Sequence, residues 1–137
     1  MNFSLHPQLA ADTINVGHLS LSQVLLMNDA RFPWIILVPQ RENVSEIIDL
    51  TPDDQATLFQ EMAAASHALR TEFNPDKLNI GSLGNIVPQL HVHVVARFAQ
   101  DPAWPGPVWG AGQAKTYKES EATARSASIA KALNIAA

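Results

Sequence analysis

The 137-residue chain contains no cysteine. Disulfide bonds, thiolate nucleophiles and thiolate metal sites are therefore excluded, and the composition is compatible with a reducing cytoplasm. No apolar run is long enough to cross a bilayer, and the first residues lack the basic and apolar regions of a signal peptide. The formal net charge of −4 gives no general attraction for nucleic acid. We therefore expect a cytoplasmic protein without nucleic-acid or membrane partners, in which any phosphate recognition is local.

Hydrophobic residues make up 47% of the chain, a fraction typical of a globular protein. A chain of 137 residues can build one well-buried domain and is too short for two ordinary ones. We predict a single domain over residues 1–137, with its core at about 14–98. Residues 99–137 comprise a segment rich in proline and tryptophan and a helical tail, which we expect to cap the domain or to meet a partner.

The pattern of apolar residues predicts an α+β fold. Segments 14–19, 23–28 and 34–38 are typical of strands, and their closeness in sequence favours antiparallel pairing. The strongest helix signal begins at Thr51-Pro52, an N-cap followed by a proline in the first helical position, and it ends at Asn74. We expect an antiparallel sheet of about five strands with this long helix and a C-terminal helix. The remaining predicted elements are a strand at about 77–81, a strand containing two histidines, and a helix at about 117–133.

The segment from Val87 to Arg97 contains the side chains on which the functional prediction depends. In a strand, alternate residues share a face. One face would then be apolar, and the other would display the row Gln89, His91, His93, Val95 and Arg97. From the residues alone, the two histidines have three possible uses: nucleophile and donor in phosphoryl transfer, half of a metal site that needs a third ligand, or polar residues on a solvated edge strand. Arg97, at the end of the row, is expected to be a charged residue at the rim of the site formed by the histidines.

The stretch Gln89-Leu90-His91-Val92-His93-Val94-Val95 resembles the motif of the histidine triad family, His-φ-His-φ-His-φ-φ, where φ is apolar. Several other blocks look like the family in the same order between about Val16 and Phe98, among them Trp34–Pro39, Asp49–Asp53 and Asn79–Asn85. The resemblance implies the histidine triad fold and a nucleotide hydrolase or nucleotidyl transferase.

In that family the middle histidine attacks the α-phosphorus of a nucleotide and forms a nucleotidyl-histidine. The resemblance therefore implies that His91 is the nucleophile and that His93 contacts the phosphate. Two positions depart from the family pattern: Gln89 replaces the first motif histidine, and Trp34 stands where relatives often carry another. Glutamine can donate a hydrogen bond but cannot carry a proton at neutral pH, so a histidine at position 89 is expected to raise the rate.

The resemblance also implies residues that bind the substrate. Asn28 stands where the family places a side chain that contacts the ribose, and Asn79 and Asn85 stand where amides contact phosphate oxygens or the leaving group. Implied substrates are small nucleotide conjugates, namely dinucleoside polyphosphates, nucleoside phosphoramidates or nucleotidyl sugars. No cofactor and no metal are implied, and a homodimer is expected. Two alternatives stay open: a nucleotide sensor without turnover, and a metal-dependent hydrolase that uses the His-x-His pair as ligands.

Overall fold

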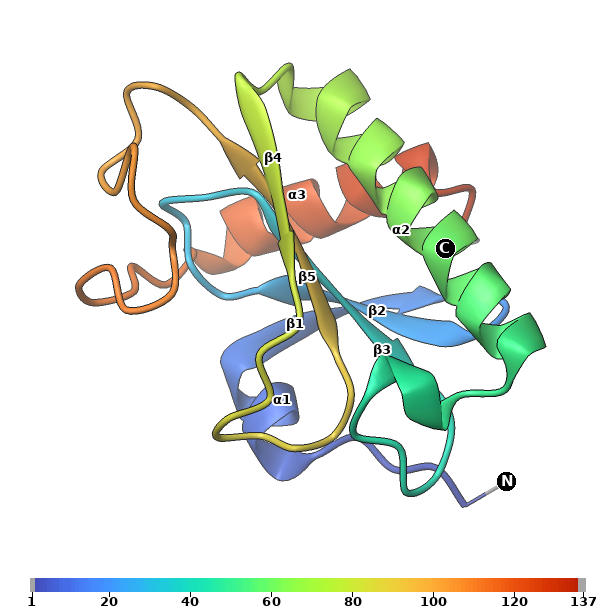
Figure 1. The fold of residues 1–137 in the computed structure, drawn as a ribbon. Helices are drawn as coiled ribbons and strands as arrows, with labels where there is room; N and C mark the ends of the chain where they lie inside the picture. The colour runs from blue at the N-terminus through green and yellow to red at the C-terminus, as the bar shows by residue number, and fades with distance from the viewer. Residues whose placement is uncertain (1, 136–137) are drawn as a thin grey trace.

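The computed structural model describes residues 2–135 and shows a five-stranded antiparallel sheet with helices packed against it (Figure 1). The strand order is β1-β2-β3-β5-β4, which makes β5 an interior strand. Within the described residues, the outer edge of β4 pairs with no other strand. The predicted α+β class is confirmed. The elements are α1 (Pro7–Asp12), β1 (Thr13–His18), β2 (Ser22–Met27), β3 (Trp34–Pro39), a 3₁₀ turn η1 (Ile47–Asp49), α2 (Pro52–Phe73), β4 (Lys77–Gly81), β5 (Val92–Arg97) and α3 (Glu119–Ala132).

The two faces of the sheet are covered differently. Helices α2 and α3 pack on one face, and α1 packs with loop residues on the other. Because side chains alternate along a strand, β5 gives Val94 and Ala96 to the face under the long helices, and His93 and Val95 to the opposite face. The predicted division into two faces is confirmed within β5. The strand itself is shorter than the segment, because it begins only at Val92.

Helix α2 begins and ends where its sequence signals predict. The hydroxyl of Thr51 accepts a hydrogen bond from the backbone N–H of Asp54, and Pro52 occupies the first turn. Asn74 ends the helix in a left-handed conformation, with φ of 48°. Strand β1 is irregular near its end, because its pairing with β2 shifts register between Asn15 and Gly17.

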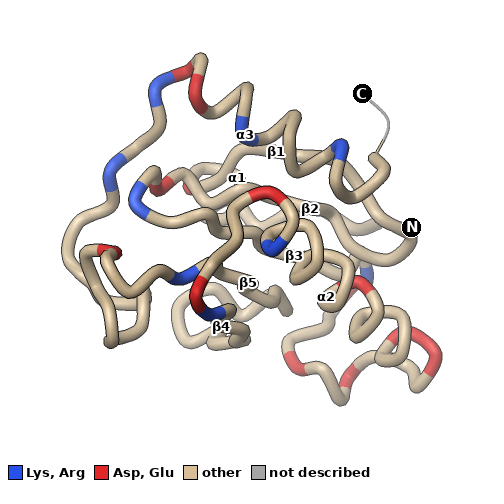
Figure 2. Tube along the Cα trace, turned by 90° about the horizontal axis from the view of Figure 1, so that it is seen from above, with Lys and Arg blue, Asp and Glu red and all other residues tan. Residues whose placement is uncertain are grey.

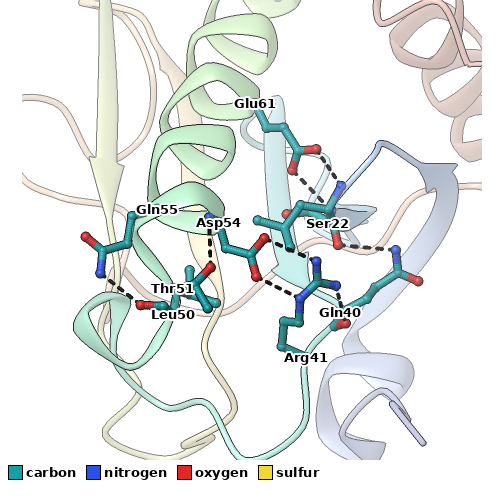
Figure 3. A network of polar contacts seen from close by, with 9 residues as sticks. Ser22, Gln40, Arg41, Leu50, Thr51, Asp54, Gln55 and Glu61 are labelled. Atoms are coloured by element: carbon teal, nitrogen blue, oxygen red, sulfur yellow. Dashed lines mark hydrogen bonds and ion pairs between the residues drawn. The ribbon is translucent and has the colours of Figure 1, made fainter. Parts of the chain in front are cut away.

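A buried carboxylate, which the sequence patterns did not reveal, ties α2 to the sheet. Glu61 lies on α2 and is only 6% exposed. One of its oxygens accepts a hydrogen bond from the backbone N–H of Ser22 (Figure 3). The other accepts from the backbone N–H of Leu21 and from the hydroxyl of Ser20. Because a buried charge is stable only when it is paired or hydrogen-bonded, these three donors fix the helix against the turn between β1 and β2.

The C-terminal helix packs beside β1 and α2 on the helix-covered face. Arg125 on α3 lies over the rings of Phe73 and Tyr117 and donates to the Tyr117 hydroxyl. The prediction of a helix at about 117–133 is confirmed by α3. No helix among residues 2–135 combines the length and apolar character needed to cross a membrane. Figure 2 shows basic and acidic residues interspersed over several elements, without a continuous basic stripe.

Candidate active site

A cleft of about 550 Å³ opens on the sheet face opposite the long helices. His91 and His93 form part of its wall. The other walls come from segments far apart in sequence: α1, the start of β3, the loop at 83–87, and the segment at 108–114. The two histidines of the polar row therefore face a cavity of a size that suits a small ligand, and not bulk solvent.

His91 is held by a hydrogen bond through one of its two ring nitrogens. The side chain is 6% exposed, and its Nδ1 lies 2.7 Å from the carbonyl oxygen of Gln89. A carbonyl oxygen can only accept, so Nδ1 carries the hydrogen and donates it. The neutral ring then has its lone pair on Nε2. This is the tautomer that a nucleophilic or basic histidine requires, and sequence alone did not name the carbonyl that selects it.

His93 is also held through its Nδ1, but this atom accepts a hydrogen bond, whereas Nδ1 of His91 donates one. His93 is 5% exposed, and its Nδ1 accepts a hydrogen bond of 2.9 Å from the indole N–H of Trp34. An indole nitrogen can only donate, so the hydrogen of neutral His93 is on Nε2. Burial lowers the pKa of His93 to about 4, with a smaller contribution from His91. At neutral pH His93 is therefore an uncharged ring that can donate from Nε2.

The two rings are adjacent, with centroids 4.9 Å apart in an edge-to-face arrangement. One ring offers a lone pair and the other offers a hydrogen-bond donor. A nucleophile beside a donor for a developing oxyanion is the minimum arrangement for transfer at a phosphorus atom. The histidine pair is therefore not the solvated edge of a sheet, because β5 is an interior strand and both rings are buried at a cleft.

Trp34 controls the chemistry of its neighbour, which leads to a testable result. Replacing Trp34 by phenylalanine keeps an aromatic ring but removes the donor to His93 Nδ1. The indole N–H can bond only the neutral ring, so its loss should raise the pKa of His93, although burial, the main cause of the low value of about 4, remains. Turnover should fall about tenfold, because the Nε2–H tautomer is no longer selected. A histidine NMR titration and a pH profile of kcat measure both effects, and an unchanged titration curve would contradict this role.

The structure brings some of the predicted site residues together and separates others. Asn85 lines the cleft with the two histidines. The side chain of Asn28 is turned away from them and accepts a hydrogen bond from the backbone N–H of Tyr117. Asn79 accepts a hydrogen bond from the guanidinium of Arg97. Neither of these two asparagines lines the cleft.

Two expectations about side-chain position need correction. Arg97 was expected at the rim but is only 1% exposed, because it forms an ion pair with Asp101, also buried, at 2.8 Å. Gln89 was expected on the same face as the histidines. Its side-chain amide instead binds the backbone of Ser4 and His6, and only its backbone carbonyl oxygen contacts the His91 ring. Gln89 lies just before β5, where the alternation of a strand no longer dictates its direction.

Further lining residues come from segments that the motif does not cover. Trp109 packs against His93 with centroids 5.4 Å apart, and its ring occupies the space that a side chain at Gly81 would need. In the sequence, the only indication of a role for Trp109 was that it lies in the segment rich in proline and tryptophan, which was expected to cap the domain or to meet a partner. Asp29 and Arg31 form an ion pair of 2.8 Å at the cleft, and Arg31 also donates to the carbonyl of Ala111. Although burial opposes ionisation, the hydrogen bonds from Arg31 lower the pKa of Asp29.

A metal centre would need a further ligand beside the histidine pair. Across residues 2–135 no three histidine, aspartate or glutamate side chains are grouped so that they could hold a metal ion. Trp34 uses the only lone pair of the neutral His93 ring, so of the two histidines only His91 has a free lone pair for a metal ion. The geometry therefore gives no support to the alternative in which His91 and His93 are metal ligands.

Known proteins with the same fold share this arrangement of elements. A histidine triad protein from Sinorhizobium meliloti 1021 is 49% identical, with 95% of this chain and 96% of that chain covered and a TM-score of 0.93. A histidine triad protein from Marinobacter aquaeolei VT8 is 44% identical, with 96% of both chains covered and a TM-score of 0.94. A bis(5'-nucleosyl)-tetraphosphatase [asymmetrical] from Schizosaccharomyces pombe is 31% identical over 72 residues.

That match to the tetraphosphatase covers 49% of this chain and 39% of the yeast protein, so the chain spans less than half of its length. The family model of the HIT domain matches residues 8–100, which include all of α1 except Pro7, the whole sheet and both histidines. With this match and the two bacterial structures, each more than 40% identical over nearly the full chain, the chain belongs to the histidine triad family.

Proposed function

We propose that this protein is a nucleotide hydrolase or nucleotidyl transferase that acts at the α-phosphate of a nucleotide conjugate. The observation that carries the proposal is the opposite hydrogen bonding of the two adjacent rings. His91 has its Nδ1 hydrogen bound to the Gln89 carbonyl, and His93 has its Nδ1 lone pair bound to Trp34. The two free Nε2 atoms are therefore a nucleophile and a donor, side by side at the cleft.

In the proposed reaction, His91 Nε2 attacks the α-phosphorus, and the bond to the leaving group breaks. The leaving group departs with the electron pair of that bond and takes a proton from the solvent, which the attacking water later replaces. The ring becomes a nucleotidyl-histidine and keeps its hydrogen on Nδ1, where the Gln89 carbonyl stabilises the resulting positive charge. The His93 Nε2–H donates to a non-bridging phosphate oxygen, whose negative charge grows in the transition state. Water, or another acceptor, then attacks the same phosphorus, releases a proton and frees Nε2. Asn85, at the cleft wall, is the one asparagine of the predicted set placed to add a neutral donor.

The charge of the cleft favours one substrate class among the three. Among the described residues that line it, Asp12, Asp29 and Arg31 are the only ones with a full charge at neutral pH, and Arg31 is already paired with Asp29. A chain of several phosphates would therefore enter a cleft without a free cation. A nucleoside phosphoramidate has one charged phosphate and needs less compensation. We propose substrates with a single phosphate.

The experiment compares adenosine 5′-phosphoramidate with diadenosine tetraphosphate, with the products separated by chromatography. We expect kcat/KM for the phosphoramidate to be at least about tenfold higher, since 1.4 kcal/mol of uncompensated charge is sufficient for that ratio. A higher value for the tetraphosphate would contradict the charge argument. Saturable binding of both compounds without any product would favour the sensor alternative. Loss of activity with a chelator would favour the metal-dependent hydrolase.

We also propose that two copies associate, as the resemblance implies. The feature that supports this proposal is β4, whose outer side is unpaired within the described residues and whose Ile80 is 47% exposed. Light scattering during size exclusion should give twice the mass of the chain. The Ile80→Glu variant should give the monomer mass, and a monomeric parent protein would refute the proposal.

A further inference from the structure

The side chain of Gln89 fastens the beginning of the chain to the histidine segment. Its Oε1 accepts a hydrogen bond of 2.8 Å from the backbone N–H of His6, and its Nε2 donates one of 2.9 Å to the carbonyl of Ser4. We call residues 2–6 the N-terminal strap. One amide group thus pairs with the strap much as the backbone of a neighbouring strand would, although the two segments are more than 80 residues apart in sequence.

The same residue holds the nucleophile through its main chain. The Gln89 carbonyl accepts the hydrogen of His91 Nδ1 at 2.7 Å. A residue that is fixed by two side-chain hydrogen bonds has little freedom to rotate its carbonyl. We propose that Gln89 is a positioning residue: its side chain, anchored on the N-terminal strap, orients its carbonyl so that His91 keeps the tautomer with Nε2 free. The expected effect of Gln89 on catalysis rests on the proposed function, whereas its effect on the tautomer of His91 does not.

The shape of the amide explains why glutamine, and not histidine, suits position 89. In a primary amide the oxygen and one N–H lie side by side and point in the same direction. They match the carbonyl of Ser4 and the N–H of His6, which the strap presents two residues apart. The two nitrogens of an imidazole point in diverging directions, so a histidine side chain cannot form both bonds to the same segment. The family histidine would therefore release the strap.

Releasing the strap would also disturb a wall of the cleft. The strap leads directly into α1, where the His6 side chain accepts a hydrogen bond from the backbone N–H of Gln8. Gln8, Leu9 and Asp12 of this short helix line the cleft, and Leu9 is 5% exposed within the core of that sheet face. Gln89 thus couples the orientation of the nucleophile to the placement of the α1 wall.

The test compares Gln89→Leu, which removes both hydrogen bonds, with a deletion of residues 1–6, which removes both of their partners. The matched control is Gln55→Leu, because Gln55 makes the same kind of bond, to the Leu50 carbonyl at 2.9 Å, at the start of α2 (Figure 3). Long-range ¹H–¹⁵N NMR spectra report the tautomer of His91 without any substrate. We expect the Nδ1–H form alone in the parent and in the control, and a mixture of tautomers in Gln89→Leu and in the deletion.

Kinetics with adenosine 5′-phosphoramidate give the second readout. In Gln89→Leu, kcat should fall about 10- to 100-fold, as when a group that orients a ligating histidine is lost. KM should rise as well, because α1 is less well held. Gln89→Leu should have no further effect in the deletion background, since its partners are already absent. Gln89→His should also lower kcat, which reverses the expectation drawn from the motif.

Two results would overturn the inference. One is an unchanged His91 tautomer in both Gln89→Leu and the deletion, and the other is a Gln89→His variant as fast as the parent. If the parent protein cleaves no nucleotide conjugate, the proposed function fails, while the NMR comparison still decides the role of Gln89. If Gln89→Leu does not fold, the deletion decides it alone.

Discussion

Replacing His91 by alanine is expected to reduce turnover of a nucleoside phosphoramidate by about 10³-fold or more, because no other group at the cleft can take over as nucleophile. His93 cannot do so, since its Nδ1 is bound to Trp34 and its Nε2 carries the hydrogen. Nucleotide affinity should stay within about tenfold, or 1.4 kcal/mol, because the walls of the cleft are unchanged. Single-turnover kinetics and calorimetric titration with AMP measure the two quantities separately.

His67→Ala is the matched control, because His67 is exposed on α2, on the opposite side of the sheet from the cleft. The control should keep the parental rate. Incubation of the parent with substrate, followed by rapid acid-free quenching and mass spectrometry, should detect a nucleotidyl adduct that is missing in His91→Ala. If His91→Ala retained turnover near the parental rate, His91 would have no catalytic role and the proposed function would have to be abandoned.

Replacing Arg97 by leucine is expected to lower the free energy of unfolding by about 3–5 kcal/mol, the cost of leaving one member of a buried ion pair without its partner. Arg97 and Asp101 are both almost fully buried, and the guanidinium also donates to Asn79 and lies over the ring of Phe32. Urea unfolding at neutral pH measures the change. Adding Asp101→Asn to Arg97→Leu should recover part of the loss, because the uncompensated charge is then removed.

The pair also predicts a pH dependence. Hydrogen bonds from Arg97 lower the pKa of Asp101 from 3.8 to about 2. Because the folded-state pKa is depressed, the stabilisation is complete above the ordinary value and is lost as the pH falls from about 3.8 through about 2. Arg97→Leu should be less sensitive to pH over this range. Exposed Arg70→Leu serves as the control and should change stability by less than about 0.5 kcal/mol. A similar small loss for Arg97→Leu would show that the buried pair is not needed.

Local signals predicted the elements well, because they depend on neighbours in sequence. Thr51, Pro52 and Asn74 delimit α2 through bonds and backbone angles within one turn of the helix. The alternation of apolar residues around His93 depends only on strand geometry, so the face of β5 that carries the histidine was predictable. Burial of the row was not predictable, because it depends on β5 lying between β3 and β4.

Side-chain partners from distant segments could not be predicted in the same way. Asn28 binds Tyr117, Trp34 binds His93, and Gln89 binds Ser4 and His6. Each side chain has several torsions, and the fold decides which backbone groups come within reach. Periodicity gives a face of a strand but no partner on it, and Gln89 lies outside the strand altogether. This is why the motif alone placed the glutamine beside the histidines.

The strap described above has a practical consequence for anyone who purifies this enzyme candidate. An affinity tag fused ahead of Asn2 would lie next to the N-terminal strap, which Gln89 holds through two hydrogen bonds. At the other end, Ile135 packs against Gly17 on β1, on the face covered by the long helices. A tag joined after Ala137 would leave the strap free of added residues, and assays on such a fusion should report the behaviour of the untagged chain.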